Sequence, residues 1–169
     1  MDGSAGKRTR CVVNALILPL VLSLAAPACA QDLLWAKRAG GTSSICAEGI
    51  GIALDGAGNS HVTGLFCGSA TFGSGEANET TLTSAGSSDI FVAKYDRHGL
   101  LLWAKRAGGT NVDEGHGIAV DGAGNSYVTG DFSGSATFGP GEANETTLTS
   151  TGLVNIFVAK FKGARRSVQ

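Results

Sequence analysis

The strongest constraint on the fold is an internal duplication. The ten residues LLWAKRAGGT at Leu33–Thr42 return unchanged at Leu101–Thr110, and GEANETTLTS at Gly75–Ser84 returns at Gly141–Ser150. Self-similarity at a fixed period is typical of repeat arrays and propellers, in which one unit cannot bury its apolar face alone and packs against its neighbours. We therefore expect a chain that contains two similar structural units.

The first thirty residues have the layout of a secretory signal. Three basic residues precede an apolar run at Val12–Ala26, and small residues lead up to Ala30. The apolar run is shorter than the roughly 20 residues that a membrane-spanning helix needs. We expect cleavage after Ala30, no transmembrane segment, and a secreted, extracellular or cell-surface location. The alternative is a lipoprotein anchored through Cys29.

Strand signals dominate the rest of the chain. Short segments rich in β-branched and aromatic residues, bounded by Gly, Asn or Asp, recur in both units. Examples are Leu101–Lys105, Ile118–Val120, Tyr127–Thr129 and Ile156–Lys160. No segment after residue 30 sustains a helical period. The sequence therefore predicts an all-β fold of four-stranded antiparallel sheets, with a long polar loop at Ser135–Gly152 between the second and third strands of a unit.

Tight turns are expected between these strands. Glycines and asparagine in Asp55–Ser60 and Asp121–Ser126 can adopt positive φ, which predicts a hairpin at each place. A further hairpin is expected across Asp96–Gly99. The first two turns also look like calcium loops, but they lack the alternating carboxylates of an EF-hand and are explained by turn formation alone. No metal site is predicted.

Two segments resemble a known repeat. GIAVDGAGNSYVTGDFSG at Gly117–Gly134 and NIFVAKF at Asn155–Phe161 are similar to the bacterial SBBP-type β-propeller repeat, and the likeness extends over residues 33–161. The resemblance implies four-stranded propeller blades in a secreted or surface protein, and it brings no catalytic residues with it. The expected parts are a signal peptide (1–30), a first β-propeller repeat (31–107), a second repeat (108–163) and a C-terminal tail (164–169).

About two blades are too few to close a propeller, which typically has 4–8. The duplicated part begins with an LLWAK strand and ends at Phe161 without another one. We therefore expect an incomplete propeller in each chain. Either several chains self-assemble, with the N-terminal strand of one completing the last blade of another, or the chain is a truncated fragment of a longer propeller.

Cys46 and Cys67 are the only cysteines after residue 30, and they flank the hairpin predicted at Asp55–Ser60. They lie at nearly equal distances from its turn, and an extracellular location favours an oxidised pair. The second unit has Val112 and Ser133 near the two positions, so both cysteines are absent there together. We predict a Cys46–Cys67 disulfide; two reduced, buried thiols are the alternative.

No catalytic residue is predicted. The histidines are His61, His98 and His116, and none has a histidine counterpart in the other unit. A Ser-His-Asp triad needs a positioned nucleophile, and the chain has no GxSxG motif to supply one. We expect these histidines on turns or on strand surfaces.

Trp35 and Trp103 are the candidates for ligand stacking, because such rings can lie against a sugar or a quinone. The segment Tyr95–Trp103 is also similar to quinoprotein propeller repeats. The leucines that precede each tryptophan favour packing between blades instead. No cofactor is predicted.

Charge gives little support for a nucleic-acid partner. Three of the 13 basic and one of the 14 acidic residues lie in the first thirty, so the remainder carries 10 basic and 13 acidic residues. Nucleic-acid-binding domains show a clustered basic excess. The favoured function is a binding or scaffolding module without catalytic activity, for a surface glycan or a protein ligand. The alternatives are a non-functional fragment, a lectin-like carbohydrate-binding oligomer and a quinoprotein-like enzyme.

Overall fold

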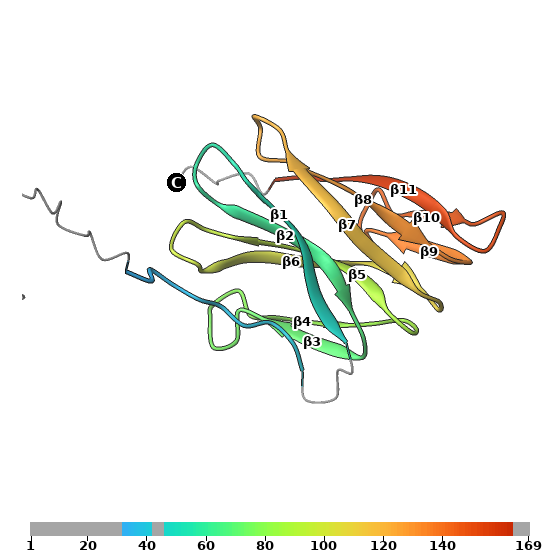
Figure 1. The fold of residues 1–169 in the computed structure, drawn as a ribbon, viewed down its shortest axis with the longest axis horizontal. Coiled ribbons are helices and arrows are strands. Elements are labelled where there is room, and N and C mark those ends of the chain that lie inside the picture. Colours follow the sequence, from blue (N-terminus) through green and yellow to red (C-terminus); the bar gives the residue numbers. More distant parts are fainter. Residues whose placement is uncertain (1–31, 42–45, 164–169) are drawn as a thin grey trace, which may run out of the picture. The chain divides into compact units, whose positions relative to one another are not determined.

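The computed structural model describes residues 32–41 and 46–163, which contain eleven β-strands and no helix (Figure 1). The all-β prediction is confirmed. Accordingly, the described residues include no helix long and apolar enough to cross a membrane. The expected signal peptide, Cys29 and the C-terminal tail lie outside the described residues.

Four strands of the first repeat lie side by side in one antiparallel sheet. Their order is β1 (Ala47–Leu54), β2 (Ser60–Phe66), β5 (Asp89–Tyr95) and β6 (Leu101–Gly109). Between β2 and β5 the chain forms a separate hairpin of β3 (Ser69–Phe72) and β4 (Thr80–Thr83). The residues before β1, 33–41, run alongside that hairpin and are joined to it by a bridge between Gly40 and Thr71 (Figure 1).

The second repeat has the same arrangement, with one strand fewer among the described residues. Its sheet has the order β11 (Asn155–Phe161), β8 (Ser126–Phe132) and β7 (Asp113–Val120), and its hairpin consists of β9 (Ser135–Phe138) and β10 (Thr146–Thr149). In the first repeat, β6 pairs with the outer edge of β5. Among the described residues no strand pairs with the corresponding outer edge of β11.

The prediction of a polar loop at Ser135–Gly152 was wrong, because strands β9 and β10 lie within this segment. Hydroxyl groups meet across this hairpin, with Thr137 Oγ1 and Thr147 Oγ1 2.9 Å apart. Phe138, the next residue along β9, points to the other face and packs in the hydrophobic core. Cross-strand hydroxyl pairs of this kind stabilise a sheet, whereas serine, threonine and glycine in a sequence favour a loop assignment.

The three predicted hairpin turns are confirmed. Each begins with an aspartate whose carboxylate accepts backbone N–H bonds from inside the turn; Asp55 Oδ1, for example, accepts from Ala57 and Asn59, both at 3.0 Å. Each also contains a glycine with positive φ, a backbone conformation that is strained for other residues. These glycines are Gly58 (φ 78°), Gly99 (φ 79°) and Gly124 (φ 76°).

Strand β6 belongs to both repeats. Its first part pairs with β5 of the first repeat, from the Tyr95–Leu101 pair onward. Its last residues, Ala107–Gly109, pair with β9 of the second repeat. The boundary expected after residue 107 therefore falls inside a strand, and a single six-stranded sheet continues from one repeat into the next.

The two faces of the first sheet have different neighbours. Because side chains alternate along a strand, Ile90 and Val92 of β5 face the second repeat, whereas Phe91 and Tyr95 face the opposite way. Ile90 and Val92 belong to the core between the repeats. This core also contains side chains of the second repeat, namely Val128, Phe132, Ala136, Phe138, Phe157 and Phe161.

Candidate functional site

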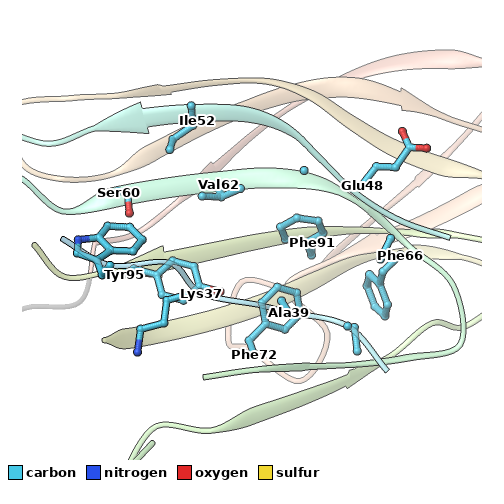
Figure 2. A pocket seen from close by; sticks show the side chains of 15 residues that line it. Lys37, Ala39, Glu48, Ile52, Ser60, Val62, Phe66, Phe72, Phe91 and Tyr95 are labelled. Atoms are coloured by element: carbon cyan, nitrogen blue, oxygen red, sulfur yellow. The ribbon is translucent and has the colours of Figure 1, made fainter. Parts of the chain in front are cut away.

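The first repeat contains a cavity of about 280 Å³, here called the first cavity. It lies between residues 35–40 and the sheet face that turns away from the second repeat. Figure 2 shows the rings of Phe66, Phe72, Phe91 and Tyr95 along it. Most of its remaining lining residues are also apolar. An apolar recess of this kind suits an aliphatic or aromatic group.

Residues 33–41, here called the leading segment, form one wall of the first cavity. Lys37 Nζ lies 2.6 Å from Glu76 Oε1, and Gly40 and Thr71 exchange backbone hydrogen bonds at 3.3 and 3.1 Å. The leading segment is thereby fixed to the β3–β4 hairpin. The same contacts recur in the second repeat, where Lys105 of β6 pairs with Glu142.

Between the repeats, the space that corresponds to the first cavity is filled. The cavity residues Ala39, Val62, Phe66, Ala70, Phe72, Phe91 and Tyr95 have Ala107, Val128, Phe132, Ala136, Phe138, Phe157 and Phe161 as counterparts, and all of these lie in the core between the repeats. That core has two further members, Ile90 (0 % exposed) and Val92 (1 %). The first cavity is the space that two such side chains would fill.

The counterparts of these two residues are exposed. Ile156 and Val158 of β11 correspond to Ile90 and Val92, and their exposures are 83 % and 73 %. The described chain therefore has an unfilled apolar recess on one repeat and, on the other repeat, the two side chains that fill the equivalent recess.

A second cavity, of about 540 Å³, lies between β11 and the β9–β10 hairpin. Its lining includes Glu142 and Asn144. The corresponding space in the first repeat is occupied by Leu101 of β6, whose N–H donates to Glu76 Oε2 (2.6 Å) and whose carbonyl accepts from Asn78 Nδ2 (3.1 Å). Glu76 and Asn78 are the counterparts of Glu142 and Asn144. The second cavity is thus the counterpart of the position that the LLWAK strand occupies in the first repeat.

Ser60 lines the first cavity and is buried there. Its Oγ has no hydrogen-bond partner in the described structure. The counterpart Ser126 is satisfied, because His61 of the preceding repeat lies against it. A buried hydroxyl without a partner costs about 1–3 kcal/mol, so this wall of the cavity favours an additional polar contact.

His61 is completely buried between the repeats, which corrects the prediction of a turn or strand-surface position. Its Nδ1 lies 2.7 Å from Ser126 Oγ and its Nε2 lies 3.4 Å from Asp55 Oδ2. Lys94 Nζ lies 2.9 Å from the same carboxylate oxygen. Burial lowers the pKa of His61, and the Lys94 charge adds to this while Asp55 opposes it.

Ser126, His61 and Asp55 are the three residue types of a hydrolase triad, but their surroundings differ from those of an active site. Ser126 is completely buried by the packing of the two repeats, so its Oγ is closed to a substrate. Burial raises the pKa of Asp55, yet hydrogen bonds from Asn59 and Lys94 outweigh it and hold that pKa well below its usual range. The geometry describes a polar contact that joins two repeats.

The other two histidines lie at the surface. His98 accepts a hydrogen bond from its neighbour Arg97 at 3.0 Å. His116 Nε2 lies 2.9 Å from Asp131 Oδ2 and 3.8 Å from Glu114 Oε2, so these three groups are close enough to share a cation. The histidine–carboxylate pairing already accounts for their proximity. The first repeat has Ile50 in the position of His116.

The calcium-like loops use their aspartates internally. Asp121 Oδ1 accepts from the N–H groups of Ala123 (3.0 Å) and Asn125 (2.9 Å), and Oδ2 accepts from Asn125 Nδ2 (2.8 Å). These hydrogen bonds, led by those from Asn125, lower the pKa of Asp121 well below its usual range. The carboxylate thus has partners within its own turn.

The predicted Cys46–Cys67 disulfide is confirmed, with a Cα–Cα distance of 5.3 Å. It joins the start of β1 to the end of β2. A register shift between Gly49 and Gly51 brings the two cysteines opposite each other. In the second repeat, Ser133 Oγ donates instead to the carbonyl of Val112 at 3.3 Å.

The structure separates the two tryptophans. Trp103 packs against the core between the repeats, with its ring edge-on to His61 at 6.4 Å. Trp35 lines the first cavity and is 38 % exposed. Of the two predicted candidates for ligand stacking, Trp35 is therefore the one that presents ring surface beside a cavity.

The fold and these sites define an all-β repeat protein. Over residues 32–41 and 46–163 its antiparallel sheets pack face to face and do not close into a ring. Residues 102–131, from β6 to β8, match the family model described as SBBP, a beta-propeller repeat. The chain thus contains an SBBP-type repeat. Its open arrangement is consistent with an incomplete propeller. A comparison with curated proteins gave no match.

Proposed function

We propose that the protein is secreted and acts outside the cell, or at its surface, as a binding or scaffolding module without catalytic activity. The observation that supports this most is the distribution of apolar surface. The apolar residues that bury each other between the two repeats have counterparts that lie uncovered. In the first repeat these counterparts line the first cavity, and in the second repeat they are Ile156 and Val158. Surfaces of this kind serve contact between protein units.

The extracellular location is supported by the signal-like sequence of the first thirty residues and by the disulfide, since disulfides persist in oxidising compartments. The test is export of the full chain from a bacterial host, compared with a chain that lacks residues 2–30. We expect exported protein that begins at Gln31 and carries the Cys46–Cys67 bond, as measured by intact mass. Retention of the full chain in the cytoplasm, or a lipid mass on Cys29, would contradict simple secretion.

A lectin-like function is the second candidate, and it is favoured by Trp35 beside the first cavity. Sugar rings stack on exposed aromatic faces. A glycan array probed with the exported protein and with its Trp35→Ala variant tests this function. Binding that the variant loses supports a lectin that stacks its ligand on Trp35. Equal binding by both proteins would remove Trp35 from the site, and no binding by either would count against a lectin and leave scaffolding as the function.

A further inference from the structure

We propose that copies of this chain assemble head to tail. The leading segment of one copy adds as a strand to the outer edge of β11 in a second copy. Ile156 and Val158 of that second copy fill the first cavity of the first. This inference deepens the proposed scaffolding function and rests on it, because it names a second copy of the chain as the partner.

The contact between the two repeats provides the template for the strand pairing. Strand β6 has the sequence of the leading segment, and β5 and β11 share the run IFVAK. In the first repeat the paired residues are Val92–Lys105, Ala93–Ala104 and Lys94–Trp103. The same register between copies pairs Val158 with Lys37, Ala159 with Ala36, and Lys160 with Trp35.

The second cavity has the shape and chemistry to receive the leading segment. In the first repeat Leu101 occupies this space and is 2 % exposed, whereas its counterpart Leu33 is 82 % exposed. Glu142 and Asn144 line the second cavity and correspond to the groups that bond the Leu101 backbone. Leu33 of the copy that supplies the leading segment would therefore occupy the second cavity of the other copy. There, Glu142 and Asn144 would bond its backbone.

The first cavity receives the other half of the same contact. Seven of its apolar lining residues have counterparts that share the core between the repeats with Ile90 and Val92. Ile156 and Val158 are identical to those two residues in type and in position along the strand. The two cavities and the two exposed segments are thus the separated halves of one interface, for which the chain already contains a packed example.

The partner is a second copy because the geometry of one chain keeps the two halves apart. The leading segment is fixed to the β3–β4 hairpin through Lys37 and Gly40. The second repeat packs on the opposite face of the first sheet. Strand β6 shows that a segment can hold its own hairpin and pair with the preceding sheet simultaneously. The leading segment can therefore bind β11 of another copy without rearrangement.

Such an interface joins different surfaces on the two copies, so it produces a ring if the rotation closes and a fibre if it does not. Propellers close with about 4–8 blades. With two repeats in each copy, a closed ring would contain about two to four copies.

The test is the mass of the purified, oxidised exported protein, which begins at Gln31, by light scattering, with variants at positions that are exposed in one chain. Leu33→Asp blocks the leading segment and Val158→Asp blocks β11. The matched controls are Leu34→Asp and Leu153→Asp, which place the same charge at exposed apolar positions whose counterparts, Leu102 and Ser87, stay exposed within the chain. We expect oligomers for the wild type and both controls, and folded monomers for the two blocking variants.

Mixing the two blocking variants identifies the type of interface. Each retains one intact half, so the mixture should form a 1:1 dimer and nothing larger. A wild-type monomer across the accessible concentration range, or oligomers unaffected by either blocking variant, would overturn the proposal. A folded, exported monomer would leave the proposed secretion and glycan binding to their own tests.

Cross-linking tests the register and does not depend on the blocking variants. One chain carries Ala36→Cys and the other Ala159→Cys, and each is mixed with its partner under mild oxidation. We expect a covalent dimer from this pair and at least tenfold less from Ala36→Cys with Val158→Cys, whose side chains lie on opposite faces of the paired strands. Equal yields would contradict the proposed register.

Discussion

His61 Nδ1 lies 2.7 Å from Ser126 Oγ, and this hydrogen bond joins one repeat to the next in a completely buried position. The corresponding residue of the second repeat is Tyr127, and the corresponding serine of the first repeat is Ser60. One contact of this type is therefore made within the chain. Tyr127 and Ser60, which hold the corresponding positions, do not meet within the chain.

The burial of His61 predicts a loss of stability in mild acid. Its folded-state pKa is lowered from 6.5, so below that pH the unfolded chain binds a proton that the folded chain does not. Stability from this group is present above pH 6.5 and is lost as the pH falls towards the folded-state pKa, by at most about 1.4 kcal/mol per pH unit. Urea unfolding at pH 7.5 and 5.5 should show the fall, with a smaller fall in His61→Gln. The surface variant His98→Gln should behave as the wild type; an identical pH dependence in all three proteins would refute the prediction.

Two equivalent lysines should differ in their contribution to stability. Lys94 and its partner Asp55 are buried, whereas Lys160 beside Asp121 is half exposed. Removing one member of a buried ion pair costs about 3–5 kcal/mol, and exposed pairs contribute about 0–1 kcal/mol. Chemical denaturation should therefore show a large loss for Lys94→Met and a small one for Lys160→Met. Both variants are measured in a Val158→Asp background, which blocks the proposed self-association and so keeps Lys160 exposed. Equal losses would contradict the assignment of Lys94 as the buried and Lys160 as the exposed lysine.

Gly99 is constrained both by its backbone and by Trp35. Its φ is 79°, and a Cβ would lie 2.7 Å from the indole ring. Gly75 has the same φ of 79° with nothing within 4 Å, so Gly75→Ala measures the backbone cost alone, about 1–2 kcal/mol. We expect Gly99→Ala to destabilise more than Gly75→Ala and, alone of the two, to change tryptophan fluorescence. Matching spectra and stabilities would show that Trp35 does not rest on this turn.

A single substitution should strengthen the proposed assembly. Within the chain, Arg106 of β6 pairs with the buried Asp89, but the counterpart of Asp89 in β11 is Asn155. Asn155→Asp would give Arg38 of a second copy the same ion pair. Because hydrogen bonds between charged groups are stronger than neutral ones, we expect self-association about tenfold tighter, a gain of about 1.4 kcal/mol. Adding Arg38→Gln should remove the gain; a gain that persists would show that the introduced carboxylate has a different partner.

The strands that sequence patterns predicted correctly are those with a strong local signal. Alternating β-branched and aromatic residues indicate β2, β5, β8 and β11. An Asp-Gly-x-Gly-Asn turn positions the β1–β2 and β7–β8 hairpins, and the turn at Asp96–Gly99 positions the β5–β6 hairpin. The Cys46–Cys67 disulfide also followed from distance to a turn. These features depend on neighbours in the sequence, so a single sequence contains them.

The features that were missed depend on contacts between distant segments. The β9–β10 hairpin has threonine pairs that stabilise only once they face each other, and their residues are those of a loop. His61 is a polar residue in a strand, and its burial comes from Ser126, which lies 65 positions away. The two cavities became recognisable only when the packed contact between repeats could be compared with the open ends.

Strand β6 is shared by two repeats, and this determines how such a chain can grow. A duplication that starts at LLWAK adds an edge strand to β11, whose outer edge is unpaired among the described residues, and brings a new sheet to cover its exposed face. The added repeat then presents the same open edge, one repeat further on. Each round of duplication is thus structurally compatible with the last, which fits a sequence whose two copies still share ten-residue runs without a single change.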